Sequence, residues 1–435
     1  MTEEEKPKKS ERATDATAAT LREQSMTMPR QPEINIGTMG HVDHGKTTLV
    51  QALTGVWASR HSEELKRGIT IKLGYADMPI YKCPNCEPPK NYSTQPICPN
   101  CGSKATFSRA ISFVDAPGHE ALMATLLSGA AIMDGALLVI AADEPCPQPQ
   151  TREHLAAADA IGIRNIVIVQ NKVDIVDEKR ARESHEEIKR FVKGTVAEKA
   201  PIIPISAQHR VNIDVLIEAM EEFIPTPKRD QTKPPLMYIV RSFDINKPGT
   251  AIEKLEGGVV GGTIIQGRIV VGDQIEIHPG MITEKEGRNK YNPLITEIIS
   301  LQAGGRNVDE ARCGGLVGVG TLLDPSFSKA DGLTGNVAGK TDMLPPTLSE
   351  LTMETHILEQ AVGTKELSKI DEVGMNETLL LHVGAAITVG KITSVTKGKV
   401  KAELTRPVCA QSGSRVAISR KIAGRWRLIG YGLIK

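Results

Sequence analysis

One segment, Gly40 to Thr47 (GHVDHGKT), restricts the possible folds of this chain more than any other. A short strand-like run at residues 33–36 precedes it, and a helical pattern follows from about Thr47 to Leu53. The two glycines let backbone N–H groups point inward around a polyphosphate, Lys46 offers charge to the outer phosphates, and the Thr47 hydroxyl suits Mg²⁺. The helix N-terminus attracts the same anion. The segment therefore predicts a phosphate-binding loop between a strand and a helix of an α/β domain.

Two further segments carry residues expected near the outermost phosphate. Asp115 ends a strand-like run, so its carboxylate can hold the Mg²⁺ shell through water, while the Gly118 N–H can sense a γ-phosphate. His119 then either orients an attacking water or simply begins a helix, and the residues alone favour neither role. Earlier in the chain, Thr70 is the candidate hydroxyl that reaches Mg²⁺ only when a γ-phosphate is present, and Gly68 allows close backbone approach.

A third motif predicts which base is bound. Residues 171–174 read NKVD and follow a strand-like run, and the sequence Ser206-Ala207-Gln208 follows the next one. The Asp174 carboxylate can accept two hydrogen bonds from N1–H and the 2-amino group of guanine, which adenine does not offer. Backbone N–H groups of the later segment can meet the guanine O6. These elements, in this order, predict a guanine-nucleotide switch that binds GTP or GDP with Mg²⁺.

An insert at about residues 80–105 carries two C-x-x-C pairs, Cys83 with Cys86 and Cys98 with Cys101. Four thiolates at this spacing are typical of a tetrahedral Zn²⁺ site. A site with four protein ligands has no open position, so we expect a structural zinc rather than a catalytic one. Paired disulfides are disfavoured because we expect the chain to lie in a reducing, cytoplasmic compartment.

Composition and the positions of proline and glycine divide the 435 residues into several units. We expect a mobile tail at 1–32, a nucleotide-binding domain at 33–228 and two β-barrel domains at 229–344 and 345–435, with proline-rich boundaries between them. The expected strands of the first barrel include 274–278 and 294–301. No window has the unbroken apolar length that spans a bilayer, so no membrane contact is expected.

The end of the chain is strongly basic. Residues 391–435 contain eleven Lys or Arg and one acidic residue, Glu403, a net charge of 11 − 1 = +10. This charge favours contact with nucleic acid, with Lys421, Arg425 and Arg427 as candidate contacts, over a merely solvated basic face. The aromatic side chains Trp426 and Tyr431 either stack on RNA or belong to the core.

Together, GHVDHGKT, RGITI, DAPGH, NKVD and SAQ, followed by two barrels, resemble a translational GTPase of the elongation factor Tu type. Longer runs carry a narrower resemblance, to the gamma subunit of the heterotrimeric initiation factor two of archaea and eukaryotes. They are SEELKRGITIKLGYA, the cysteine insert before DAPGHE, PQPQTREH, RSFDINKPGT and the final AGRWRLIGYG.

The resemblance implies a GTPase with a low intrinsic rate that carries methionylated initiator tRNA to the small ribosomal subunit and releases it after hydrolysis. It also implies alpha and beta subunits as partners. Its expected site residues fall into three groups. They are Asp43, His44, Gly45, Lys46, Thr47, Thr48, Asn171, Lys172, Val173, Asp174, Ser206, Ala207 and Gln208 for the nucleotide, Asp43, Thr47, Gly68 and Thr70 for Mg²⁺, and Asp115, Gly118 and His119 for catalysis.

Two alternatives remain open at this point. The first is an elongation-type or selenocysteine-type factor, which would use the same switch to carry another aminoacylated tRNA; the cysteine insert argues against it. The second is a scaffold that binds GTP without turning it over and serves as a structural core for partner subunits.

Overall fold

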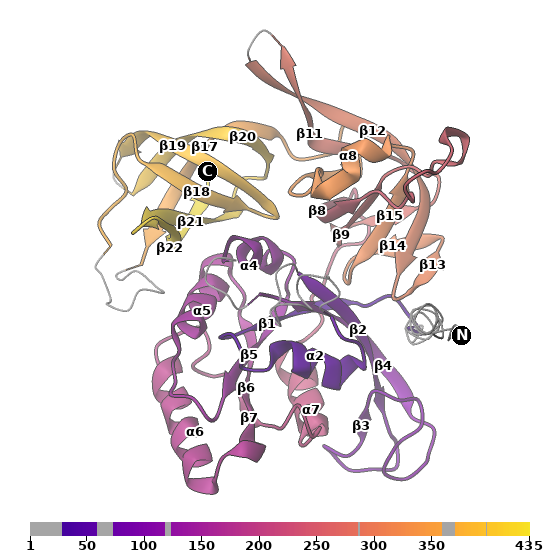
Figure 1. The fold of residues 1–435 in the computed structure, drawn as a ribbon, viewed down its shortest axis with the longest axis vertical. Coiled ribbons are helices and arrows are strands. Elements are labelled where there is room, and N and C mark those ends of the chain that lie inside the picture. The colour runs from indigo at the N-terminus through magenta and orange to yellow at the C-terminus, as the bar shows by residue number, and fades with distance from the viewer. Residues whose placement is uncertain (1–27, 59–72, 118–122, 286–287, 359–369, 397) are drawn as a thin grey trace, which may run out of the picture.

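The computed structural model describes residues 28–58, 73–117, 123–285, 288–358, 370–396 and 398–435. Figure 1 shows three units, an α/β unit below and two β-barrels above it. Most of the predicted N-terminal tail lies outside the described residues. Among the helices that the structure describes, none combines the length and apolar composition needed to cross a membrane.

The α/β unit is built on a seven-stranded sheet with the order β3-β2-β4-β1-β5-β6-β7. Strands β4, β1, β5, β6 and β7 run parallel, and β2 and β3 are antiparallel additions at one edge. The central strands β1, β5 and β6 are buried along nearly their whole length, and β5 is an unbroken apolar run, because helices cover both faces of the sheet. The bounds are β1 Ile34–Met39, β2 Gly74–Lys82, β3 Tyr92–Ser93, β4 Thr106–Asp115, β5 Gly135–Ala141, β6 Asn165–Asn171 and β7 Ile202–Pro204.

Helices lie on both faces of this sheet. One face packs against Leu49 and Leu53 of α2 and Leu216 of α7, and the other against Leu126 of α4 and Leu155 of α5. Several helix ends follow from local sequence: Pro149 begins α5, and left-handed glycines end α2 and α5. The bounds are α2 Lys46–Thr54, α4 Met123–Ala130, α5 Pro149–Ile161, α6 Glu178–Val192 and α7 Ile213–Phe223, with the 3₁₀ turn η2 at Val173–Ile175.

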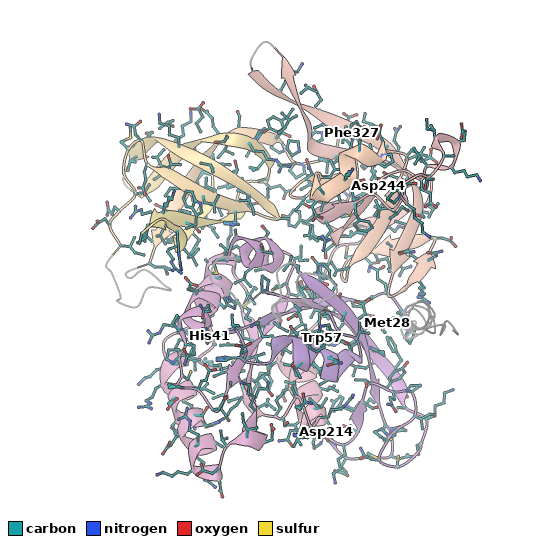
Figure 2. The ribbon with its side chains drawn as sticks, in the orientation of Figure 1. Met28, His41, Trp57, Asp214, Asp244 and Phe327 are labelled. Carbon is teal, nitrogen blue, oxygen red and sulfur yellow. The ribbon has the colours of Figure 1, made fainter. Side chains whose placement is uncertain are left out.

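The first barrel closes through six strands, because β11 pairs with β12 at the ends of the order β11-β16-β8-β9-β15-β12. Its interior is aliphatic, and Phe327 of α8 packs against it (Figure 2). Strands β11 and β12 are much longer than predicted, since proline, glycine and polar residues at 279–293 hide the strand pattern. The bounds are β8 Leu236–Phe243, η3 Ile252–Lys254, β9 Val259–Gln266, β10 Arg268–Val270, β11 Gln274–Lys285, β12 Arg288–Ala303, β13 Arg306–Val308, β14 Glu310–Arg312, β15 Val317–Thr321, α8 Pro325–Ser328, η4 Lys329–Asp331 and β16 Val337–Lys340.

The second barrel is closed in the order β17-β20-β19-β18-β21-β22. Alternate residues such as Leu379, Leu381 and Val383 fill its interior, as expected for antiparallel strands with one buried face. The bounds are β17 Thr347–Ile357, β18 Thr378–Val383, β19 Ala386–Thr396, β20 Lys399–Cys409, β21 Arg415–Ile422 and β22 Arg425–Ile434. The fold class predicted from the sequence is therefore confirmed.

One apolar cluster extends across the contacts between the three units. A single cluster joins Leu127 of α4 and Leu155 of α5 to Val240 of the first barrel and to Ala417 and Leu428 of the second. The second barrel packs directly against α4 and α5, as Figure 1 also shows, and the first barrel joins the same cluster through Val240. A displacement of either helix would therefore disturb its packing against the second barrel.

Candidate nucleotide-binding site

The phosphate loop connects β1 to α2 and depends on its two glycines. Gly40 and Gly45 have φ angles of 136° and 86°, which other residues rarely adopt. A Cβ atom on Gly40 would lie 2.2 Å from the Val139 carbonyl oxygen, and one on Gly45 would lie 2.4 Å from Asn171 Nδ2. Asp43 also takes a left-handed conformation, with φ 62°. The loop is therefore a tight turn that requires glycine at positions 40 and 45.

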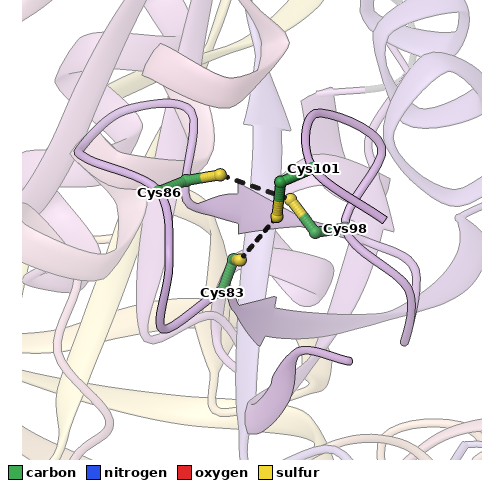
Figure 3. Close-up of side chains that lie close together, drawn as sticks. All are labelled: Cys83, Cys86, Cys98 and Cys101. Atoms are coloured by element: carbon green, nitrogen blue, oxygen red, sulfur yellow. Dashed lines mark hydrogen bonds between the residues drawn. The ribbon is translucent and has the colours of Figure 1, made fainter. Parts of the chain in front are cut away.

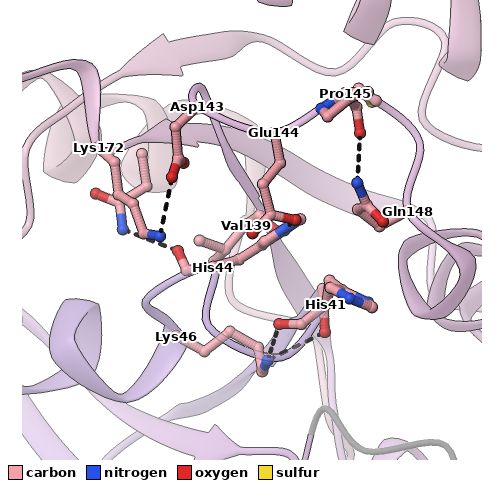
Figure 4. Close-up of polar contacts among 12 residues, drawn as sticks. His41, His44, Lys46, Val139, Asp143, Glu144, Pro145, Gln148 and Lys172 are labelled. Carbon is pink, nitrogen blue, oxygen red and sulfur yellow. Dashed lines mark hydrogen bonds and ion pairs between the residues drawn. The ribbon is translucent and has the colours of Figure 1, made fainter. Parts of the chain in front are cut away.

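Lys46 folds back over this loop. Its Nζ donates to the carbonyl oxygens of Gly40 at 3.0 Å and His41 at 2.6 Å (Figure 4). Burial lowers the pKa of Lys46 to about 8, although Asp115 and Asp43 act in the opposite direction. A buried ammonium enclosed by the loop is well placed to neutralise phosphate oxygens, whose charge would raise the pKa again.

Asp115 and Thr47 form the candidate magnesium site. Thr47 Oγ1 donates to Asp115 Oδ2 at 2.7 Å, and Thr38 Oγ1 donates to Asp115 Oδ1 at 2.7 Å. The parallel pairing of β1 with β4 brings Asp115 beside Thr38 at the carboxyl ends of the strands. A hydroxyl next to a carboxylate offers the hard oxygen ligands that Mg²⁺ prefers, so these residues fit the ion.

Asn171 holds the phosphate loop to the segment that follows β7. Only 2% of this residue is exposed. Its Nδ2 donates to the His44 carbonyl oxygen at 2.9 Å, and its Oδ1 accepts from the Ala207 N–H at 3.0 Å. Two motifs that are 127 residues apart in sequence therefore meet at one buried amide.

The rest of the candidate guanine site surrounds Asn171. Lys172 Nζ lies 3.5 Å from Asp143 Oδ2 (Figure 4), and Asp174 Oδ2 lies 3.6 Å from His209 Nε2. The Asp174 side chain is 23% exposed, so its carboxylate is accessible to a base. Of the remaining predicted residues, Thr48 and Val173 are half-buried, Ser206 and Ala207 are buried, and Gln208 is exposed.

Two site residues, Thr38 and His154, were not predicted from the sequence, whereas His44 was. Thr38 orients the Asp115 carboxylate, and His154 Nδ1 accepts a hydrogen bond from the Gly40 N–H at 2.8 Å. His44 Nδ1 lies 3.1 Å from the Val139 carbonyl oxygen, and burial lowers the pKa of His44 to about 4. Burial likewise keeps the pKa of His154 well below its usual value. Both imidazoles are therefore neutral at pH 7, and His154 can act as an acceptor.

Four predicted residues, Gly68, Thr70, Gly118 and His119, lie outside the described part of the chain. Their assignments to Mg²⁺, to the γ-phosphate and to water stay predictions. Thr47 and Asp115, which are expected at the same Mg²⁺ and phosphate site, are described and lie next to each other.

The four cysteines of the insert form one cluster. Their sulfur atoms all lie within 4.8 Å of one another. Cys83 Sγ is 3.4 Å from Cys101 Sγ, and Cys86 Sγ is 3.8 Å from Cys98 Sγ (Figure 3). Tetrahedral Zn–S bonds of about 2.3 Å separate the sulfur atoms by about 3.8 Å, so the cluster fits this ion.

The cluster lies far from the phosphate loop along the sheet. Cys83 follows the end of β2 that pairs with Thr106, whereas Asp115 lies at the opposite end of β4. Backbone hydrogen bonds such as Gly102 N–H to the Cys98 carbonyl oxygen shape the second cysteine turn. The insert is thus placed to stabilise a long loop rather than to touch a nucleotide.

The prediction that Arg427 contacts RNA is wrong. Arg427 is only 8% exposed and pairs with Glu153 of α5, inside the contact between the second barrel and the α/β unit. Tyr431 is also engaged, because its ring stacks on His356 with centroids 4.8 Å apart and carries the Arg415 guanidinium 4.4 Å above it. Much of the basic charge of residues 391–435 therefore serves internal contacts, which net charge alone does not reveal.

Three family models match the chain. The model of the elongation factor Tu GTP binding domain matches residues 31–226, that of elongation factor Tu domain 2 matches residues 257–328, and that of the C-terminal part of initiation factor eIF2 gamma matches residues 349–434. Each match falls on one of the three structural units described above.

Relatives match over nearly the whole chain. Translation initiation factor 2 subunit gamma of Pyrococcus abyssi is 60% identical over 406 residues, which is 93% of this chain and 98% of the relative. The protein of the same name from Archaeoglobus fulgidus is 61% identical over 404 residues, or 93% of this chain and 95% of the relative.

Solved structures of elongation factors share the fold at lower identity. A bacterial selenocysteine-specific elongation factor, EF-Sec, is 24% identical with a TM-score of 0.71, covering 93% of this chain and 58% of that one. Translation elongation factor SelB of Methanococcus maripaludis, in complex with the GTP analogue GppNHp, is 24% identical with a TM-score of 0.68, covering 94% of this chain and 80% of that one.

Proposed function

Because the chain belongs to the family of translation initiation factor 2 gamma subunits, we propose that, bound to GTP, it carries methionylated initiator tRNA to the small ribosomal subunit and releases it after hydrolysis. The GTPase domain is of the elongation factor Tu type. The observation that supports the proposal most is the buried Asn171 amide, which holds the phosphate loop against the segment expected to meet guanine. A role at the ribosome would place the chain in the cytoplasm.

In the proposed site, each group has one task. Lys46 and the loop N–H groups hold the outer phosphates, and Asp174 selects guanine through N1–H and the 2-amino group. Thr47 would hold Mg²⁺ and Asp115 would hold its shell through water, with Asp43 nearby; when bound, the ion neutralises charge on the phosphate oxygens. Gly68 and Thr70 would complete the Mg²⁺ site when a γ-phosphate is present, the Gly118 N–H contacts that phosphate, and His119 orients the attacking water.

The packing of α4 suggests how the site communicates with the barrels. This helix begins shortly after Gly118, and its residue Leu127 belongs to the apolar cluster that includes Val240 and Ala417. A change of the γ-phosphate contacts at Gly118 would therefore shift α4 against both barrels. We propose that this shift forms the tRNA-binding groove in the GTP state and disrupts it after hydrolysis.

Partner subunits and zinc complete the proposal. We propose that the chain is the gamma component of a heterotrimer with alpha and beta subunits, which its family membership supports. The cluster of Cys83, Cys86, Cys98 and Cys101 holds a structural Zn²⁺. We place the domain boundaries after residues 228 and 344.

Selectivity among tRNAs tests the proposed cargo. The assay measures binding of methionylated initiator tRNA and methionylated elongator tRNA to the chain with a GTP analogue, with and without the alpha subunit. Tighter binding of the initiator tRNA is expected, whereas equal binding or a preference for selenocysteinyl-tRNA would contradict the proposal. Single-turnover GTP hydrolysis with small ribosomal subunits then distinguishes a switch from a scaffold, since a scaffold would show no stimulated rate.

A further inference from the structure

Helix α5 contacts both the phosphate loop and the second barrel through two consecutive residues. His154 Nδ1 accepts the Gly40 N–H at 2.8 Å, and the Glu153 carboxylate pairs with Arg427 of β22. Successive helical residues point about 100° apart, so the two side chains leave the helix toward different neighbours. Figure 1 shows α5 next to β22.

The ion pair is deeply buried. The Glu153 side chain is 3% exposed and that of Arg427 is 9% exposed. Burial raises the pKa of Glu153 even though Arg427 lowers it, so the carboxylate depends on its partner to stay charged. A buried pair of this kind fixes position strongly, because removal of one partner leaves an uncompensated charge.

The barrel holds α5 at its other end as well. Arg415 of β21 donates to the carbonyl oxygens of Asp159 at 3.0 Å and Ala160 at 3.2 Å. A cation at a helix C-terminus is favoured by the helix dipole and adds a donor to carbonyl oxygens of the last turn. Two arginines of the second barrel thus fix the position of α5 along its length.

The loop end of this connection is equally constrained. Gly40 lies close to the neighbouring backbone, because a Cβ there would be 2.2 Å from the Val139 carbonyl oxygen, and its own carbonyl oxygen accepts from Lys46 Nζ at 3.0 Å. Its N–H points to the buried acceptor on α5. Displacement of α5 would break this bond and loosen the carbonyl that holds Lys46.

We propose that His154 is a positioning residue for the phosphate loop and that the Glu153–Arg427 pair makes its position, and hence guanine-nucleotide affinity, depend on the docking of the second barrel. The inference rests on the proposed function, since it concerns the same nucleotide site. By reciprocity, bound nucleotide would stabilise the docking of the second barrel on α5.

A double-mutant cycle on the full chain tests the proposal, with affinity for a fluorescent GDP analogue as the readout. We expect Arg427→Met and His154→Leu each to weaken binding by about fivefold or more. The combined variant should lose no more than His154→Leu alone, because both changes break the same hydrogen bond. His154→Asn keeps an acceptor near the Nδ1 position and should recover most of the affinity.

Arg420→Met is the matched control. Arg420 lies in the same barrel and pairs with Glu377, but it has no contact with α5 among those described. We expect it to leave GDP affinity unchanged. If Arg427→Met lowers the yield of folded chain, Glu153→Met with Arg427→Met removes both charges and should show the same loss.

The outcomes separate this inference from the proposed function. A wild-type chain that binds no guanine nucleotide would overturn both. Unchanged affinity in the Arg427 variant, an equal loss in the Arg420 variant, or additive losses in the cycle would overturn the coupling through α5 alone.

Discussion

Replacement of Asn171 by alanine should destabilise the α/β unit far more than its size suggests. The substitution leaves the His44 carbonyl oxygen and the Ala207 N–H without their partner in a site where Asn171 is 2% exposed. Each buried polar group left unpaired costs about 1–3 kcal/mol. We therefore expect a loss of about 3 kcal/mol in the free energy of unfolding, allowing for some relaxation.

Urea unfolding followed by fluorescence measures this loss. The chain has two tryptophans, so Trp426→Phe leaves Trp57, next to α2, as the reporter of the α/β unit. Asn165→Ala is the matched control, since Asn165 begins the same strand and makes one long hydrogen bond of 3.4 Å to the Asp134 carbonyl oxygen. A loss below about 1 kcal/mol for Asn171→Ala, or one no larger than that of the control, would refute the reasoning.

Three further results are expected. Asp174→Asn should weaken GDP binding by about 100-fold and favour a xanthine nucleotide, whose C2 carbonyl accepts a hydrogen bond from the new amide. Competition between GDP and the xanthine nucleotide measures both changes, and an unchanged preference for GDP would contradict the role of Asp174. Cys98→Ser should reduce zinc from about one ion per chain to almost none by mass spectrometry, with GDP affinity unchanged; retained zinc would disprove the four-thiolate site. Burial raises the pKa of Asp77 from 3.8 to about 6, so the folded chain keeps a proton that the unfolded chain releases between about pH 4 and 6. The free energy of unfolding of the wild-type chain should therefore fall by about 1–3 kcal/mol relative to Asp77→Asn as pH rises through this window. The same pH dependence of the free energy of unfolding in both chains would contradict this prediction.

The motifs predicted the parts of the site that depend on local sequence. Gly40, Gly45 and Lys46 are recognisable because the phosphate loop requires special backbone angles and a fixed spacing. The cysteine pairs are recognisable for the same reason, since a metal fixes the spacing of its ligands.

Residues that act through tertiary contact were not predictable. The role of Thr38 follows from the register of β1 against β4, and that of His154 from the packing of α5 beside β1, neither of which a single sequence specifies. The basic charge of residues 391–435 led to a wrong prediction for a related reason. The sequence does not show that Arg427 lies in the contact with α5, where it pairs with Glu153.

The barrel strands were predicted where apolar residues alternate and missed where they do not. Residues 279–293 carry proline, glycine and charged residues, yet most of them extend β11 and β12 as a long antiparallel pair. Pairing between the two strands holds them extended there, and the described residues mix exposed with buried side chains, so hydrophobic periodicity gives no signal.

The nucleotide switch is tested by comparing the binding of methionylated initiator tRNA in the two nucleotide states. The purified chain, with and without the alpha subunit, is titrated with labelled tRNA in the presence of a GTP analogue or GDP. Markedly tighter binding with the analogue is the expected result, because the γ-phosphate contacts are proposed to form the tRNA groove. Equal affinity in both states would contradict the switch and leave a chain that binds GTP only as a structural scaffold.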